Sequence, residues 1–377
     1  MTPLVKLIPP VANGILCLVL GMWCASCAGG APAESAPAPA AGVESDAPDA
    51  IEGAEDDIEG AAGIEGAAGA SDTPASVYIA GAYREGGVWK ACYWKDGERI
   101  SLAGDDGRAS GIALAAGSVY VAGFDKNEAC YWKDGVKTTL GFPSSASKGS
   151  AARANAVAAA EDGSLYIAGS YREGGVWKAC YWKDGEIAVL ADAGSSAEVY
   201  AITVAGGSVY AAGYAVFHPR SEACVWKDGE LIYLDSYAFS DASARSLAVA
   251  EGAVYTAGGD DYGACYWRDG VKTELPFSGS SAQAVSVAVF ENAVYAAGCY
   301  SDGNRKACYW RDGVKTDLPA PGADSYALSV AVSRNAVYAA GYYKDGAMKA
   351  CYWRDGVKTD LPAPGTGAYA SALALGP

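Results

Sequence analysis

Cysteine is the most reactive residue type in this 377-residue chain, and most of its eleven copies are regularly spaced. Seven of them recur in an Ala-Cys-Tyr/Val-Trp motif, at Cys92, Cys130, Cys180, Cys224, Cys265, Cys308 and Cys351. Equivalent positions in successive repeats should lie beyond the roughly 7 Å limit on the Cα separation of a disulfide. We therefore expect buried thiols and no metal site, because no histidine or C-x-x-C pair accompanies them. Cys299 stands outside the motif, and the sequence leaves open whether its thiol is exposed or packed.

Few side chains of this chain are suited to acid–base or nucleophilic catalysis. The single histidine, His218, precedes Pro219, a context more typical of a loop residue than of a general base. The carboxylates of the variable segments remain an open route to catalysis: Glu85, Glu173, Asp260, Asp261 and Asp302. We expect a protein that is not an enzyme and uses no cofactor. A carbohydrate-active hydrolase or lyase built on these carboxylates is the alternative.

Aromatic and charged side chains concentrate in the segments that vary between repeats. A variable set on a constant scaffold is how many binding surfaces are built, and Tyr, Trp and Arg favour interface hot spots. The candidate ligand-binding residues are Tyr83, Arg84, Trp89, Tyr171, Arg172, Tyr214, Phe217, His218, Arg220, Tyr262, Tyr300, Tyr342 and Tyr343. The alternative, that these segments are simply solvated, stays open at this point.

These residues lie in a repeat that begins near residue 77 and recurs every 40 to 46 residues, seven times in all. Each unit carries four strand-like stretches, for example 284–289, 293–297, 307–310 and 314–318. An Asp-Gly pair between the third and fourth stretch is a strong hairpin signal, because a tight turn needs positive φ. The period and the strand content predict an all-β, seven-bladed β-propeller with four-stranded blades.

The two ends of the repeat region complement each other. The first unit starts at Val77 without the Ala/Val-rich strand that opens the other units. The segment 369–375 is such a strand and has no further unit after it. We therefore expect the C-terminal strand to join the first blade and close the ring. A linear solenoid would need capping repeats instead.

The repeat motif also resembles a known type. Residues 350–361, Ala-Cys-Tyr-Trp-Arg-Asp-Gly-Val-Lys-Thr-Asp-Leu, contain the W-x-x-G-x-x-x-D-L core of HAF-type extracellular bacterial repeats and look like repeat lipoproteins of spirochaetes. The resemblance spans residues 77–375, with Lys-Ala-Cys here in place of the characteristic His-Ala-Phe. It implies an extracellular repeat domain and no particular activity.

The first 27 residues have the features of an export signal. Lys6 supplies a positive charge, an apolar stretch from Val11 to Trp23 follows, and small residues surround Cys27. We expect a lipoprotein-type signal peptide over residues 1–27 with lipidation at Cys27. Ordinary secretion and an uncleaved anchor are the alternatives. A lipidated protein would sit on the surface of a bacterial outer or cytoplasmic membrane, held by its lipid alone.

Residues 28–72 contain eleven acidic residues, no lysine or arginine, and much Ala, Gly and Pro. This composition predicts a disordered, extended linker, so the folded domain is expected at 73–377. The net charge of the chain is −16, of which the linker supplies −11 and the signal peptide +1, leaving −6 for the domain. A mildly acidic domain argues against a nucleic-acid partner, and we expect a monomer.

Up-and-down blades place the second-to-third-strand loops and the blade-to-blade connections on one face, where the sequence varies most. The sequence therefore predicts a cell-envelope binding or scaffold propeller that recognises a protein, peptide or glycan through loops on that face. A purely structural spacer without any ligand is the remaining alternative.

Overall fold

The structure, a computed structural model, describes residues 76–143, 151–190, 196–217, 220–234, 241–334 and 336–376. Within these ranges the chain forms 28 β-strands and no helix, as expected for an all-β protein. The described part of the chain contains no helix long and apolar enough to cross a membrane. All of the described residues belong to one unit, Glu52–Pro377. The predicted signal peptide (1–27) with Cys27 and the whole predicted linker (28–72) lie outside the described residues.

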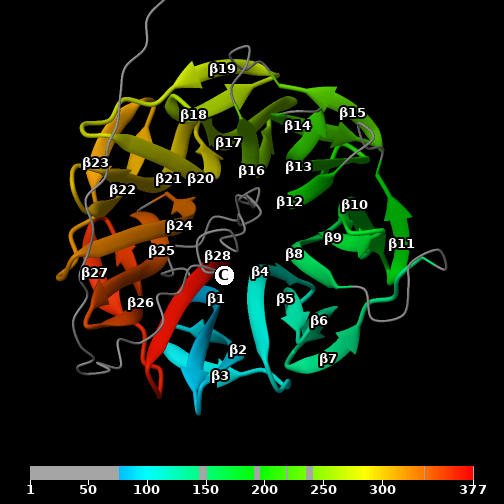
Figure 1. Cartoon of the computed structure of the whole chain (residues 1–377), viewed down its shortest axis with the longest axis horizontal. Coiled ribbons are helices and arrows are strands. Elements are labelled where there is room, and N and C mark those ends of the chain that lie inside the picture. The colour runs from blue at the N-terminus through cyan, green and yellow to red at the C-terminus, as the bar shows by residue number, and fades with distance from the viewer. Residues whose placement is uncertain are drawn as a thin grey trace, which may run out of the picture. The chain divides into compact units, whose positions relative to one another are not determined.

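Four strand positions recur along the described part of the chain, from the centre of Figure 1 outward. The innermost strands are β4 (Gly107–Ala115), β8 (Ala152–Ala159), β12 (Ala197–Ala205), β16 (Ala242–Ala250), β20 (Ser281–Phe290), β24 (Asp324–Ser333) and β28 (Gly367–Gly376). The second strands are β1 (Ser76–Glu85), β5 (Ser118–Asp125), β9 (Leu165–Glu173), β13 (Ser208–Phe217), β17 (Ala253–Asp260), β21 (Ala293–Ser301) and β25 (Ala336–Asp345). The third strands are β2 (Val88–Lys95), β6 (Glu128–Lys133), β10 (Val176–Lys183), β14 (Arg220–Lys227), β18 (Gly263–Arg268), β22 (Arg305–Arg311) and β26 (Ala347–Arg354). The outermost strands are β3 (Glu98–Ser101), β7 (Val136–Thr139), β11 (Glu186–Val189), β15 (Glu230–Tyr233), β19 (Val271–Glu274), β23 (Val314–Asp317) and β27 (Val357–Asp360).

Backbone hydrogen bonds join each group of four described strands into an antiparallel sheet. Five groups form separate four-stranded sheets, and β24–β27 and β28-β1-β2-β3 share one eight-stranded sheet through the pair Met348 and Gly367. The predicted pairing of the C-terminal strand with the first strand is present, because β28 runs antiparallel to β1 from Ser76 opposite Gly376 to Arg84 opposite Gly367. Figure 1 shows the sheets arranged around a common centre, which is a propeller-like architecture.

The hairpin between the third and fourth strand turns on the Asp-Gly pair, as predicted. In the seven turns of this kind, all within the described ranges, the aspartate φ is 47–50° and the glycine φ is 80–90°. The aspartate also accepts a hydrogen bond from the backbone N–H that opens the second strand, as Asp355 Oδ1 does from Val337 N at 2.9 Å. The turn residue therefore ties the hairpin to the second strand.

A β-bulge interrupts the pairing of the innermost and second strands. It explains the glycine of a Val/Leu-Tyr-x-Ala-Gly motif that recurs in every repeat, for example at residues 254–258. Opposite Gly258 the register shifts between Ala244 and Ser246, which leaves Arg245 unpaired in the ladder. A Cβ on Gly258 would lie 1.9 Å from the carbonyl oxygen of Ser243, so no larger residue fits without displacement of the backbone. The same approach, at 1.8–2.1 Å, occurs at Gly81, Gly123, Gly169, Gly213, Gly298 and Gly341.

Cysteine and tryptophan of the third strand pack against the neighbouring sheet. On β22, Cys308 and Trp310 share a hydrophobic cluster with Tyr255 and Leu275 of the sheet β16–β19. The seven motif tryptophans are at most 1% exposed, and every cysteine of the described ranges is buried and outside any disulfide. Burial raises the pKa of thiols such as Cys130, to about 12. The predicted burial of the motif thiols is confirmed, and the motif tryptophans are buried with them between the sheets.

Side-chain hydrogen bonds also connect adjacent sheets. Trp310 Nε1 donates to the carbonyl oxygen of Pro276, in the connection that leads out of the preceding sheet, at 2.7 Å. Trp94, in the first sheet of the chain, donates in the same way to Pro362 at 2.9 Å, although 268 residues separate the two. Near the centre, Ser329 Oγ accepts from the backbone N–H of Leu373 at 3.0 Å and links β24 to β28.

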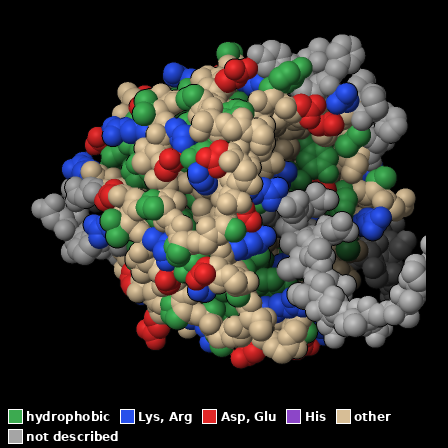
Figure 2. Space-filling model, turned by 60° about the vertical axis from the view of Figure 1, so that its left-hand side comes forward, with side chains coloured by type: hydrophobic (Ala, Val, Ile, Leu, Met, Phe, Trp, Pro, Cys, Tyr) green, Lys and Arg blue, Asp and Glu red, His purple; other side chains and the backbone are tan. Residues whose placement is uncertain are grey.

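The outermost strands are short and mix charge with an exposed valine. Val314 and Val357 are 69% and 70% exposed, and each precedes a Lys-Thr-Asp segment whose lysine and aspartate form an ion pair. Figure 2 shows acidic and basic side chains interspersed over the side that carries β22–β27. Short, charged edges are a common protection against edge-to-edge pairing with other chains.

Candidate ligand-binding site

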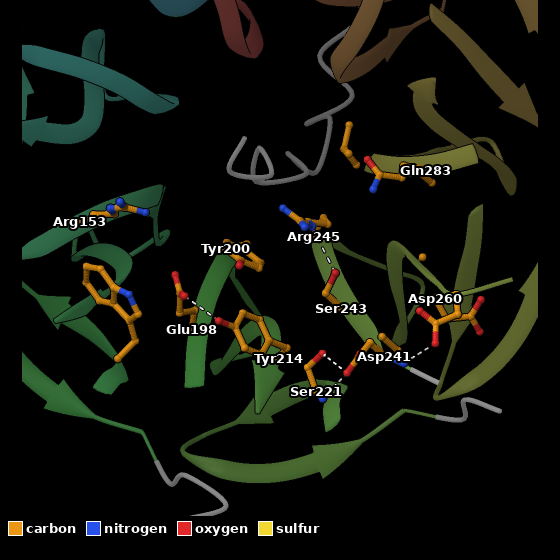
Figure 3. A pocket seen from close by; sticks show the side chains of 16 residues that line it. Arg153, Glu198, Tyr200, Tyr214, Ser221, Asp241, Ser243, Arg245, Asp260 and Gln283 are labelled. Atoms are coloured by element: carbon orange, nitrogen blue, oxygen red, sulfur yellow. Dashed lines mark hydrogen bonds between the residues drawn. The ribbon is translucent and has the colours of Figure 1, made fainter. Parts of the chain in front are cut away.

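A cavity of about 580 Å³ lies where four consecutive sheets, from β8–β11 to β20–β23, begin their innermost strands (Figure 3). This is the face that was predicted to bind a ligand, since the Asp-Gly turns lie at the other ends of the strands. Its lining residues are Arg153, Trp177, Glu198, Tyr200, Tyr214, Ser221, Asp241, Ala242, Ser243, Arg245, Gly259, Asp260, Asp261, Gln283, Ala284 and Val285. A smaller cavity of about 160 Å³ adjoins it and shares Asp260, Asp261 and Gln283.

The first residues of the innermost strands supply the core of this lining. β12 contributes Glu198 and Tyr200, and β16 contributes Ser243 and Arg245. Tyr200 and Arg245 are the unpaired residues of their bulges. Bulges re-aim side chains away from the regular alternation of a strand, and here they bring an aromatic ring and a guanidinium group from adjacent sheets to the same cavity.

Two guanidinium groups of the cavity stack on aromatic rings. The Cζ atom of Arg245 lies 5.0 Å from the ring centre of Tyr200, and that of Arg153 lies 5.0 Å from the ring of Trp177. Arg245 Nε also donates to Ser243 Oγ at 3.2 Å. Figure 3 shows Arg153 and Arg245 on either side of Tyr200. Stacking orients the guanidinium plane and so presets its N–H donors for oxygen acceptors.

Glu198 and Tyr214 form a hydrogen-bonded pair in the wall of the cavity. The Tyr214 hydroxyl donates to Glu198 Oε1 at 2.7 Å, and its ring lies 5.9 Å from that of Tyr200. Burial, together with the nearby Tyr200 and Glu198, raises the pKa of Tyr214 well above its ordinary value. The phenol therefore remains a hydrogen-bond donor over the whole physiological pH range.

Asp241 and Asp261 form an acidic rim that Arg220 partly neutralises. Asp241 Oδ1 accepts from the backbone N–H and the hydroxyl of Ser221 at 2.8 and 3.0 Å. Arg220 lies 3.6 Å from Asp241 and 3.5 Å from Asp261. The hydrogen bond from the Ser221 N–H, above all, lowers the pKa of Asp241. This carboxyl group is therefore ionised at neutral pH and can accept hydrogen bonds from a ligand.

Asp260 has a structural role that the sequence did not reveal. Its Oδ2 atom lies 2.5 Å from the ammonium group of Lys272, and the two side chains are 0% and 8% exposed. Burial opposes the charge on Lys272, but the hydrogen bond to Asp260 and the nearby acidic groups together outweigh it, and the pKa of the lysine is raised. Lys137 and Asp125 form the equivalent pair in the sheet β4–β7. This pairing stabilises the positions of Asp125 and Asp260 at the ends of their strands.

The structure brings part of the predicted site together. Tyr214 lines the larger cavity and Arg220 borders it. Tyr262, 63% exposed, and Tyr300 line the smaller cavity. The other sheets on the same face hold Trp89, half-buried, and two arginines that bond within their own hairpins: Arg84 to Gly87 and Arg172 to Gly175. His218 and the side chain of Phe217 lie outside the described residues.

The placement of five predicted tyrosines in exposed loops is wrong. Tyr83, Tyr171, Tyr300, Tyr342 and Tyr343 lie within second strands and are only 2–6% exposed. Three of them are covered by a cation from the outermost strand of their own sheet: Tyr83 by Arg99, Tyr300 by Lys315 and Tyr343 by Lys358. The second strands are longer than predicted, so the motif continues as strand where a loop was expected. Cys299 is likewise buried, and a packed thiol is the correct alternative.

Most of the cavity's charged residues were missed from the sequence. Arg153, Glu198, Tyr200 and Arg245 lie in the Ala/Val/Ser-rich run that was interpreted as plain core strand. The available signal was their size, because large polar side chains interrupt that run of small residues at equivalent positions. Within the described residues no group of three or more His, Cys, Asp or Glu side chains is arranged to hold a metal ion.

Comparison with known proteins finds distant structural similarity at low sequence identity. No protein-family model matches this sequence, and no curated protein matches it either. A crystal structure of TolB from Acinetobacter baumannii is 11% identical and aligns with 78% of this chain and 66% of its own, with a TM-score of 0.44. The crystal structure of the computationally designed Ika8 protein is 15% identical, aligns with 81% of this chain and 99% of its own, and has a TM-score of 0.40. Both similarities are too distant to bear on ligand or activity.

Proposed function

We propose that the domain is a closed, seven-bladed β-propeller, exported and held at the cell envelope by a lipid on Cys27. Two described contacts support closure: the pairing of β28 with β1 and the hydrogen bond from Trp94 to Pro362. The second contact matters most, because Trp132 and Trp310 make the same bond to the connection that leads out of the preceding sheet. The first sheet therefore contacts the last one in the same way as later sheets contact the sheet before them.

We further propose that the protein is a binding or scaffold propeller whose ligand enters the cavity of about 580 Å³. The observation that carries this proposal is the lining itself. Four sheets together place two guanidinium groups, three aromatic rings and several carboxyl groups around one cavity. Pockets with a few preset polar groups beside aromatic rings are typical of ligand sites.

The alternative of a carbohydrate-active enzyme has weaker support. A glycosidase needs one carboxyl group that stays protonated to act as general acid. The carboxyl groups here are engaged with cations or hydroxyl donors, and the pKa of Asp241 is lowered rather than raised. Asp302, another predicted candidate, is paired with Lys306 on the surface. These contacts favour binding without turnover.

A glycan and peptide array probed with the full chain tests the binding proposal. The cavity variant Arg245→Gln/Gln283→Ala should lose specific retention of whichever ligand the parent protein retains. The matched control is Arg354→Gln, since Arg354 also stacks on a tyrosine, Tyr338 at 5.5 Å, but lies beside an Asp-Gly turn on the opposite face. Equal retention by the cavity variant and the control would contradict the proposal, and turnover of a retained glycan would favour the enzyme.

A further inference from the structure

A row of alternating aromatic rings and guanidinium groups continues the cavity across the neighbouring sheets. Arg108, on β4, lies between the rings of Trp89 and Phe124, with its Cζ atom 5.5 and 5.8 Å from their centres. Arg153, on β8, lies between Phe124 and Trp177, at 5.9 and 5.0 Å. We call these five residues the stacked row.

Three adjacent sheets contribute to the stacked row, and it shares Arg153 and Trp177 with the cavity. All five side chains are half-buried, so each one contacts protein on one side and retains surface on the other. Tyr369 of β28 extends the row by one ring, with its centre 5.2 Å from that of Trp89 in an edge-to-face arrangement. The binding surface is therefore elongated, and a ligand that follows it must be a chain.

The chemistry of the stacked row selects for anionic groups. A guanidinium group that packs between two rings is restrained in its orientation, and its planar fork of N–H donors fits a carboxylate. Two such forks in succession suit a ligand that bears carboxylates at intervals. The aromatic rings between them offer apolar faces on which flat, C–H-bearing surfaces can pack.

The cavity at the end of the row favours hydrogen-bond donors and not anions. Glu198, Asp241 and Asp261 are acceptors and would repel a second run of anions. They suit a ligand that also donates hydrogen bonds, which hydroxyl groups do. A chain with carboxylates, hydroxyl groups and flat ring faces is an acidic polysaccharide.

Resting on the proposed binding function, we infer that the face of this domain binds an acidic polysaccharide of the uronic-acid class. The carboxylates pair with Arg108 and Arg153, and sugar hydroxyl groups donate to the carboxylates of the cavity. A nucleic acid fits less well, because it carries a phosphate at every nucleotide and brings few hydroxyl donors to the acceptors Glu198, Asp241 and Asp261 of the cavity.

Titration calorimetry of the full chain with an oligogalacturonate tests this inference. The matched probe is the same oligomer with every carboxyl group methyl-esterified, which keeps the sugar backbone and removes the charge. We expect binding of the acid, weakening with salt, and no binding of the ester. Arg108→Gln should weaken binding of the acid at least about tenfold, because a hydrogen bond to a charged group is lost. Arg108→Lys, which keeps the charge without the stacked fork, should give an intermediate affinity.

Arg311→Gln is the control variant, since Arg311 stacks on Tyr295 at 5.5 Å but lies beside an Asp-Gly turn on the opposite face. It should bind like the parent chain, and thermal melting verifies that each variant folds. Equal binding of acid and ester, or equal affinities of Arg108→Gln and Arg311→Gln, would overturn the inference. So would a preference for poly-glutamate or single-stranded DNA, or no binding of any probe. The array experiment on the cavity variant decides the binding function separately, because Arg108 lies outside the cavity.

Discussion

At the scale of single residues, the glycine opposite each bulge is the position with the least tolerance for change. At Gly258 a methyl group would meet the Ser243 carbonyl oxygen at 1.9 Å, which is backbone that no side-chain rotation can clear. Gly258→Ala should therefore reduce the free energy of unfolding by roughly 3 kcal/mol, the upper range for overpacking. Chemical denaturation measures the loss. Gly141→Ala is the control, because no atom lies within 4 Å of its added Cβ, and it should change stability little; equal effects of the two would contradict the account.

The motif tryptophans should carry a large share of the inter-sheet packing. Trp267 is 0% exposed and lies in a cluster with residues of the preceding sheet, including Leu234. Trp267→Ala should cost roughly 3–5 kcal/mol, the usual range for removing a buried aromatic side chain. A denaturation midpoint that corresponds to less than about 1 kcal/mol would show that this tryptophan is not core.

Residue roles could be predicted from the sequence only where the same residue type recurs at the equivalent position of all seven repeats. The cysteines and tryptophans recur in one motif, so their burial between sheets was predictable from alternation and from the apolar character of both faces. The tyrosines that follow the glycine also recur, but their burial depends on cations of a different strand, such as Lys358 over Tyr343. Cavity residues such as Arg245 occur once each, and only the bulge geometry shows where they point.

At the scale of elements, the Asp-Gly hairpins depend on two properties of aspartate. Asp312 adopts a φ of 47° and accepts a hydrogen bond from Val294 N at 2.9 Å. Asp312→Ala loses the acceptor and tolerates the left-handed conformation poorly, so it should cost about 1–2 kcal/mol. Asp312→Asn keeps an acceptor and tolerates positive φ, and should cost clearly less. Denaturation curves that place Asn and Ala at the same stability would contradict this role.

The ion pairs between second and outermost strands make stability depend on pH. Burial opposes ionisation of Asp125, but Lys137 and the backbone N–H groups of Asp105 and Asp106 outweigh it and lower the pKa of Asp125. A lowered folded pKa contributes stability that is complete above the unfolded pKa and is lost as pH falls through the folded pKa. Asp125→Asn should therefore destabilise the protein near neutral pH, and its deficit should shrink as the pH falls below about 4. Urea denaturation across this range measures the difference; a deficit independent of pH would contradict the role.

Strand order and hairpin turns were predictable, because period, Asp-Gly pairs and alternation are local signals. The bulge between the innermost and second strands was not predictable, since it arises from the close approach of two backbones. Its only sign in the sequence is the glycine opposite it. The length of the second strands was underestimated for a related reason: cations of the outermost strand allow strand pairing to continue through Tyr83, Tyr300 and Tyr343.

At the scale of the whole molecule, the proposed ring requires that β24–β27 and β28-β1-β2-β3 meet as any other neighbouring groups of four strands do. One described contact of this kind joins residues 291 positions apart, the hydrogen bond from Ser371 Oγ to the carbonyl oxygen of Ala80 at 3.1 Å. A closed ring leaves no sheet face exposed at an end, which is how propellers avoid the capping units of open arrays.

Hydrogen exchange of the full chain, followed by mass spectrometry, tests closure most directly. Peptides from β28 (Gly367–Gly376) should exchange as slowly as those from β12 (Ala197–Ala205), since both would be innermost strands paired to a second strand and covered by sheets on either side. Exchange of β28 within seconds, while β12 stays protected, would mean that the last strand is not held in the first sheet and that the ring is open.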